Sequence, residues 1–125
     1  KGHDVKFPVT NDLKFRFKTL LKQFLFHHPT LPMTQTKFNT HLLRYSLQNK
    51  EIINWHLDYV DQHKYFFHTK LPEGEFNYIG GLYGLADQKG LSYRQTVFFM
   101  IVSSLIYFER KDDFNEIVQQ IKTFK

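Results

Sequence analysis

Apolar and polar positions alternate through the first nine residues of the chain. Val5, Phe7 and Val9 are separated by Lys6 and Pro8. A period of two is typical of a β-strand with one buried face, because successive side chains of a strand point to opposite sides. The pattern therefore predicts a strand over residues 5–9.

After Thr10 the spacing of the apolar residues changes to that of an amphipathic helix. Apolar positions up to Phe24 lie three or four residues apart and share one helical face. Two prolines in the segment 27–32 make continuation of this helix unfavourable. Thr34 can cap a second helix, whose apolar residues over 38–47 are expected to pack inward.

The order of strand, helix, break and helix recurs in the second half. An aromatic and β-branched run at residues 65–71 predicts a strand, and Pro72 ends it because proline has no N–H and fits the first turn of a helix. One helical pattern, with three glycines inside it that would permit close packing, extends over 76–89. Gly90 can end that helix in the left-handed conformation, and Ser92 can cap the next one.

The two halves are interpreted as a diverged internal repeat. Alignment of Val9 with Leu71 and of Thr34 with Ser92 superimposes the order of the elements. A lone strand leaves its edges unpaired, so two copies are expected to pair their strands. Residues 1–47 form the first repeat, 48–63 a packed connector that is partly helical, 64–110 the second repeat, and 111–125 a C-terminal helix with apolar positions from Phe114 to Phe124.

Composition narrows the classes of function. The chain has 125 residues, of which 42% are hydrophobic and none is cysteine. This content supports one small domain, or two very small modules, with a packed core, and the lack of cysteine excludes disulfide and thiolate chemistry. The formal net charge of +5 is compatible with nucleic acid as a partner. No apolar run has the length of a membrane span, so a cytoplasmic protein without a membrane partner is expected.

No catalytic constellation and no phosphate-binding glycine loop stands out, so neither an enzyme activity nor a cofactor is expected. The chain has seven histidines, and no two of them have the i,i+4 spacing of a helical metal site. We therefore expect no metal site. The histidines are His3, His27, His28, His41, His56, His63 and His68.

Three short motifs resemble the ribbon-helix-helix family of DNA-binding proteins, the Arc and MetJ type. They are residues 70–73 (KLPE), 90–92 (GLS) and 100–101 (MI). The resemblance spans both halves, and two copies in one chain are similar to the TraY-type accessory proteins of plasmid conjugation. It implies a mostly α fold in which a short antiparallel two-stranded ribbon, formed within one chain by a tandem pseudodimer, enters the major groove of DNA, with a C-terminal helix added.

Strand alternation divides the ribbon residues between two faces. Expected in the core are Phe7, Val9, Leu42, Leu43, Phe67, Leu71, Met100 and Ile101, with Val5 and Thr69 also pointing inward. The lysines of the outer face can donate to guanine, and its apolar residues can contact a thymine methyl group. The predicted base-reading residues are Asp4, Lys6, Pro8, Phe66, His68 and Lys70, although Pro8 and Phe66 depart from the polar readers usual in the family.

The first turns of the two second helices are the predicted phosphate sites. Free N–H groups and the positive end of the helix dipole favour an anion there. Thr34, Ser92 and their neighbours would position the ribbon on DNA without recognising sequence. The full set is Thr34, Gln35, Thr36, Ser92, Tyr93 and Arg94.

Three functions stay open. The first is a sequence-specific double-stranded DNA-binding protein that acts as a relaxosome accessory factor near a plasmid transfer origin, with a relaxase as a further partner and further oligomerisation on DNA. The second is a transcriptional repressor or an autoregulator of plasmid genes. The third is a protein–protein interaction module, for which Tyr93, Phe98 and Phe99 are candidates for exposed aromatic residues.

Overall fold

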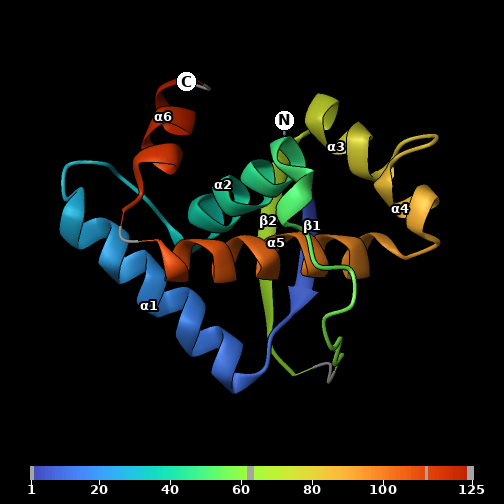
Figure 1. Ribbon diagram of the computed structural model, residues 1–125, viewed down its shortest axis with the longest axis horizontal. Coiled ribbons are helices and arrows are strands. Elements are labelled where there is room, and N and C mark those ends of the chain that lie inside the picture. Colours follow the sequence, from blue (N-terminus) through green and yellow to red (C-terminus); the bar gives the residue numbers. More distant parts are fainter. Residues whose placement is uncertain (1, 62–63, 112, 124–125) are drawn as a thin grey trace.

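A computed structural model describes residues 2–61, 64–111 and 113–123, and 62% of it is helical (Figure 1). A mostly helical chain with one two-stranded antiparallel sheet is the fold class that the sequence predicted, and it is confirmed at this level. The predicted positions Phe124 and His63 lie outside the described residues. The elements are β1 (Gly2–Pro8), α1 (Asn11–His27), α2 (Gln35–Gln48), the 3₁₀ turn η1 (Lys50–Ile52), β2 (Phe66–Pro72), α3 (Glu73–Gly80), α4 (Leu85–Lys89), α5 (Tyr93–Arg110) and α6 (Asn115–Thr123).

The two strands pair antiparallel within the one chain, as predicted. Val5 lies opposite Thr69 and Lys6 opposite His68. The Thr69 hydroxyl donates to the Val5 carbonyl at 3.0 Å, and the Val9 N–H extends the pairing to the Tyr65 carbonyl at 3.0 Å. Residues 56 to 70 positions apart in the sequence are thereby fixed in one register.

Helix α5 crosses the centre of the molecule, with α2 and α1 packed against it (Figure 1). Helix α2 also packs on β2, while α5 also packs on β1. Seven of the eight predicted core residues are buried; Phe67 is only partly buried, because it packs edge-on against Phe7 and Phe17 at the margin of the core. Within the described chain no single helix is long and apolar enough to cross a membrane, although the bent pair of Glu73–Lys89 with Tyr93–Arg110 would qualify by length and composition alone.

An aromatic cluster joins α1, α2 and the start of α6. The ring of Phe24 lies 5.4 Å from that of Phe38 and 5.5 Å from that of Phe114. All three side chains are buried. The predicted C-terminal helix thus begins next to this cluster and is held on the body of the protein by apolar contacts.

The single helix predicted over 76–89 is wrong. Helix α3 ends at Gly80, and α4 begins at Leu85. A Cβ atom on Gly81 would lie 2.5 Å from the Asn77 carbonyl oxygen, and one on Gly84 would lie 2.6 Å from the Ile79 carbonyl oxygen. These glycines therefore permit a tight turn rather than close packing between helices, whereas Gly90 has the predicted left-handed conformation, with φ at 66°.

The connector covers one side of α5. Its Trp55 and Tyr59 rings pack against Phe99 and Phe98, at 6.2 and 5.1 Å between centroids. The expectation that Phe98 and Phe99 are exposed is therefore wrong, since only 3% and 6% of these residues is accessible. Tyr93, the third aromatic candidate for a partner surface, is 47% exposed.

Candidate nucleic-acid interface

Four polar side chains share the outer face of the ribbon. Asp4, Lys6, His68 and Lys70 are all exposed. The register places Asp4 opposite Lys70 and Lys6 opposite His68, so two cross-strand pairs lie next to each other on this face. This is the side of the ribbon to which strand alternation assigned them.

Within this set the side chains constrain one another. The His68 Nδ1 atom lies 3.1 Å from the Asp4 Oδ1 atom. The stem of Lys70 lies across Gly2, because a Cβ atom on Gly2 would be only 2.2 Å from the Lys70 Cγ atom. The absence of a side chain at Gly2 thus leaves room for Lys70 to cross over β1.

The two apolar residues predicted to contact bases are less exposed than the polar ones. Pro8 is buried, and since Phe7 on the opposite face is buried as well, both faces of β1 are covered at this end of the strand. Pro8 therefore cannot contact a base, and this part of the prediction is wrong. Phe66 is partly buried and carries two cations over its ring, the Lys6 Nζ atom at 4.6 Å and the Arg94 guanidinium at 5.0 Å.

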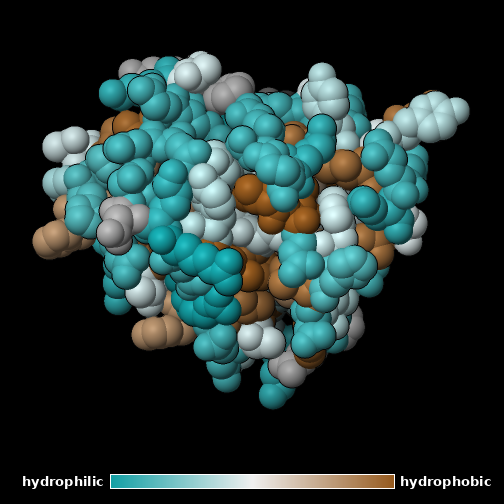
Figure 2. All heavy atoms as spheres, in the orientation of Figure 1, coloured by the Kyte–Doolittle hydropathy of each residue, from teal (hydrophilic) through white to brown (hydrophobic). Residues whose placement is uncertain are grey.

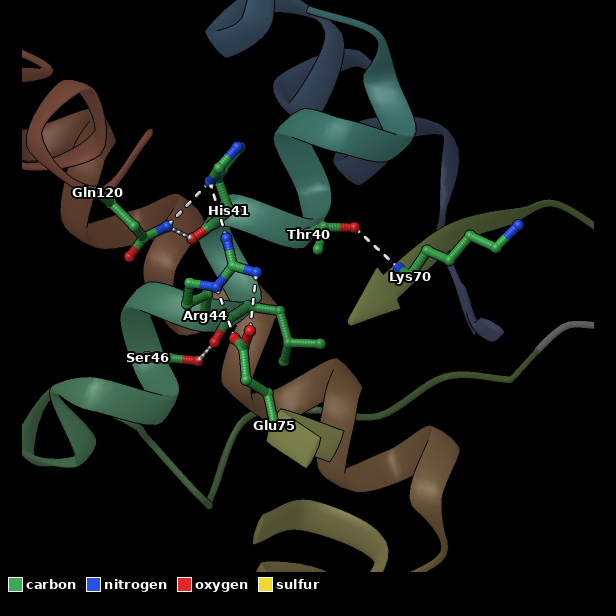
Figure 3. A network of polar contacts seen from close by, with 8 residues as sticks. Thr40, His41, Arg44, Ser46, Lys70, Glu75 and Gln120 are labelled. Carbon is green, nitrogen blue, oxygen red and sulfur yellow. Dashed lines mark hydrogen bonds and ion pairs between the residues drawn. The ribbon is translucent and has the colours of Figure 1, made fainter. Parts of the chain in front are cut away.

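Helix α2 forms hydrogen bonds with the edge of β2 that does not pair with β1 (Figure 3). The Lys70 N–H donates to the Thr40 hydroxyl oxygen at 2.8 Å, and the Asn39 side-chain amide donates to the His68 carbonyl at 3.2 Å. Both Asn39 and Thr40 are buried. Sequence analysis missed these positioning residues; the available signal was the presence of polar residues next to the apolar positions of residues 38–47.

The first turn of α2 lies beside the ribbon. Thr34 caps the helix by accepting from the Lys37 N–H at 3.2 Å, and the Gln35 side-chain amide donates to Asn39 at 2.8 Å. A pocket of about 510 Å³ brings predicted residues of both kinds together, since Thr34, Thr36 and Lys70 all line it. Lys37, which the sequence analysis did not select, lines it too and adds a cation.

The side chains in the first turn of α5 form more contacts with other protein groups than those in the first turn of α2 do. Ser92 and Gln95 form a reciprocal capping box. The Tyr93 hydroxyl donates to the Gly80 carbonyl at 2.9 Å, and the Arg94 Nη1 atom lies 3.4 Å from the Asp61 carboxylate. A pocket of about 480 Å³ includes Ser92 and Arg94 in its lining but also Asp61, so an anion here would compete with a carboxylate.

An ion pair between the buried Arg44 and the partly buried Glu75 joins α2 to α3 (Figure 3). Arg44 donates to both carboxylate oxygens of Glu75, at 2.6 and 3.0 Å.

His41 lies one helical turn before Arg44 on α2. Its Nδ1 atom accepts from the Gln120 side-chain amide at 3.2 Å if that atom carries no proton. Burial, with the positive charge of Arg44, lowers the pKa of His41 to about 4, so its imidazole is neutral near pH 7.

The free energy of unfolding should fall as the pH drops from about 6.5 to about 4. The unfolded chain protonates His41 at its ordinary pKa of 6.5, whereas the folded state resists protonation until about pH 4. Stability is therefore fully present above pH 6.5 and is lost through this window. Urea unfolding at several pH values should show a shallower pH dependence for His41→Gln, while His56→Gln, an exposed control, should match the wild type; equal slopes for all three would contradict this assignment.

Within residues 2–61, 64–111 and 113–123, no group of three histidine, aspartate or glutamate side chains could hold a metal ion.

No protein-family model, no curated protein and no solved structure matches the chain. The interpretation of this surface therefore rests on its own geometry and charge.

Proposed function

We propose that this protein binds double-stranded DNA sequence-specifically by placing its β-ribbon in the major groove. The observation that carries the proposal is the exposed outer face on which Asp4, Lys6, His68 and Lys70 lie together. A two-stranded ribbon fits the major groove of B-DNA. Lysine can donate to guanine O6 or N7, and a carboxylate can accept from the cytosine amino group, so this face has the chemistry for direct base recognition.

The arrangement of the two halves supports a single-chain pseudodimer of the ribbon-helix-helix type. Each second helix packs on the strand of the other half, α2 on β2 and α5 on β1, and the two helices pack against each other. The strands present unlike residues, Asp4 and Lys6 from one and His68 and Lys70 from the other. Such a ribbon suits an asymmetric DNA site rather than a palindrome.

Phosphate contacts would come from the first turns of α2 and α5. In α2 these groups are Thr34 and Thr36 with the added cation of Lys37. In α5 they are Ser92 and Arg94, where Arg94 would exchange Asp61 for a phosphate. Contacts of this kind fix the position of the ribbon and leave base recognition to the outer face.

The biological role that we propose is that of a relaxosome accessory factor bound near a plasmid transfer origin, without enzyme activity. A transcriptional repressor or autoregulator of plasmid genes would use the same interface. Selection of the preferred duplex from a random pool distinguishes the two roles, since the recovered sequence would match either a transfer origin or a promoter.

Duplex binding should weaken steeply as salt rises from about 50 to about 200 mM, because several phosphate contacts release counterions. Replacing Arg94 with alanine should weaken binding about equally on all duplexes and reduce the salt slope by about 1. Fluorescence titration of selected and random duplexes over this range measures both effects.

Arg110→Ala is the matched control for Arg94→Ala. It removes the same charge from the same helix, at the exposed residue that ends α5. This variant should bind as the wild type does. A change in sequence preference with unchanged nonspecific affinity in Arg94→Ala would reject the phosphate assignment, and no binding of any duplex by the wild type would reject the function.

A further inference from the structure

The pocket of about 510 Å³ between the start of α2, the end of β2 and helix α6 has the size of a small-molecule site. Figure 2 shows apolar side chains at several places between hydrophilic ones, so apolar surface alone does not identify a ligand site. This pocket, the α2–β2–α6 pocket, is distinguished by the combination of its walls. Met33, Pro72 and Ile121 give it an apolar side, and polar side chains line the rest.

Positive charge predominates in this pocket. Its lining includes Lys37, Arg44 and Lys70, and within the described residues no aspartate or glutamate lines it. Glu75 neutralises the charge of Arg44. Figure 3 shows the Lys70 ammonium group pointing away from Thr40, so the charge that remains is that of Lys37. Lys37 is exposed and forms no ion pair with any residue that the structure describes. An anionic ligand group is therefore favoured over a cationic one.

His41 adds a hydrogen-bond donor to the α2–β2–α6 pocket. Its Nδ1 atom faces two donors, the Gln120 side-chain amide at 3.2 Å and the Arg44 Nη1 atom at 3.5 Å. Because both of these groups donate, Nδ1 is the acceptor, and we assign the proton of the neutral imidazole to Nε2. Figure 3 shows Nε2 pointing away from both groups, and it has no hydrogen bond to any described residue. The Nε2–H is thus available to a ligand.

Two threonine hydroxyls supply further donors. Thr34 Oγ1 already accepts from the Lys37 N–H at 3.2 Å, so its own proton remains to be donated. Thr36 lines the pocket too, and its hydroxyl forms no hydrogen bond within the described part of the chain. Together with the Lys37 ammonium group and the His41 Nε2–H, they place four side-chain donors beside an apolar wall. A negatively charged group with several oxygen acceptors fits such a set.

We propose that the α2–β2–α6 pocket binds a small organic anion, in which a carboxylate or phosphate group is attached to an apolar body. The anionic group would accept from Lys37 and His41, and the apolar body would cover Met33 and Ile121. A bare phosphate, whether free or in a DNA backbone, would leave the apolar side uncovered and fits only half of the pocket. Because Ile121 belongs to α6 and Lys37 to α2, the ligand would also hold the C-terminal helix on the rest of the protein.

Titration with three probes in the absence of DNA tests this assignment. Phenyl phosphate has an anionic group and an apolar body, inorganic phosphate has only the anionic group, and benzyl alcohol has only the apolar body. Nuclear magnetic resonance signals of the His41 ring and of the Ile121 methyl groups report occupancy. Phenyl phosphate should shift both signals and should bind about tenfold more tightly than either other probe, because each half of the pocket adds to the affinity.

Two variants separate the two halves of the pocket. Lys37→Gln should weaken the binding of both phosphates about fivefold and leave benzyl alcohol unchanged. Ile121→Ser should remove most of the advantage of phenyl phosphate over inorganic phosphate, and Met33→Ser makes the same test without altering α6. Lys22→Gln, at an exposed lysine of α1 outside the pocket, is the matched control and should bind all three probes as the wild type does. Backbone amide spectra verify that each variant is folded.

Equal affinities for phenyl phosphate and inorganic phosphate would overturn the proposal, because they would indicate a site for anions alone. Probes that leave the His41 signals unchanged would overturn it as well, as would a loss in Lys22→Gln as large as that in Lys37→Gln. None of these titrations contains DNA, so they decide on the pocket whether or not the protein binds a duplex.

Discussion

Replacing Phe24 with alanine should lower the free energy of unfolding by about 3–5 kcal/mol. Phe24 is fully buried, and its ring contacts those of Phe38 and Phe114. The substitution would leave a cavity where α1, α2 and the start of α6 meet, and the loss of contacts adds to the lost burial of apolar area. Urea unfolding followed by circular dichroism measures the change.

Phe26→Ala is a matched control on the same helix. Its ring is 81% exposed, so removing it should change the stability by no more than about 0.5 kcal/mol. Equal losses for the two variants would mean that Phe24 does not hold the three helices together.

Replacing Lys70 with alanine should weaken binding to the selected DNA site by about 1–3 kcal/mol and relax the preference at one or two base pairs. Lys70 is exposed on the outer face of the ribbon, while its backbone N–H is fixed by Thr40 at 2.8 Å. A charged side chain on a fixed backbone is suited to recognise one base edge. Titration of the selected duplex and of its single-base variants at constant salt measures both effects.

Lys50→Ala removes the same charge from an exposed lysine outside the ribbon and should leave affinity and preference unchanged. Equal losses on every duplex for Lys70→Ala would assign Lys70 to a phosphate instead of a base. No loss at all would remove the ribbon from the interface.

Local signals were sufficient for most of the elements. The period-two pattern around Phe7 predicted β1, and the cap residues Thr34 and Ser92 predicted where α2 and α5 begin. Gly90 ends α4 as expected. These features depend on residues a few positions apart, so their physical causes are contained in short stretches of sequence.

Where the sequence-based predictions were wrong, contacts beyond the local helical or strand pattern decided the structure. The chain breaks at Gly81 and Gly84 because the backbone there passes close to carbonyl oxygens, which a helical periodicity does not reveal. Phe98 and Phe99 are covered by a connector some 40 residues earlier in the chain. Pro8 is buried because both faces of β1 are covered where the strand leaves the ribbon.

For the candidate interface, too, local sequence determined some features and tertiary contacts determined the others. Alternation along each strand determined that Lys6, His68 and Lys70 lie on the outer face, because successive side chains of a strand must point to opposite sides. Only the tertiary structure decided which of them stand opposite one another, and that Asn39 and Thr40 hold the edge of β2. Register and edge contacts join residues about 30 to 70 positions apart, and the packing of α2 and α5 on the ribbon selects them.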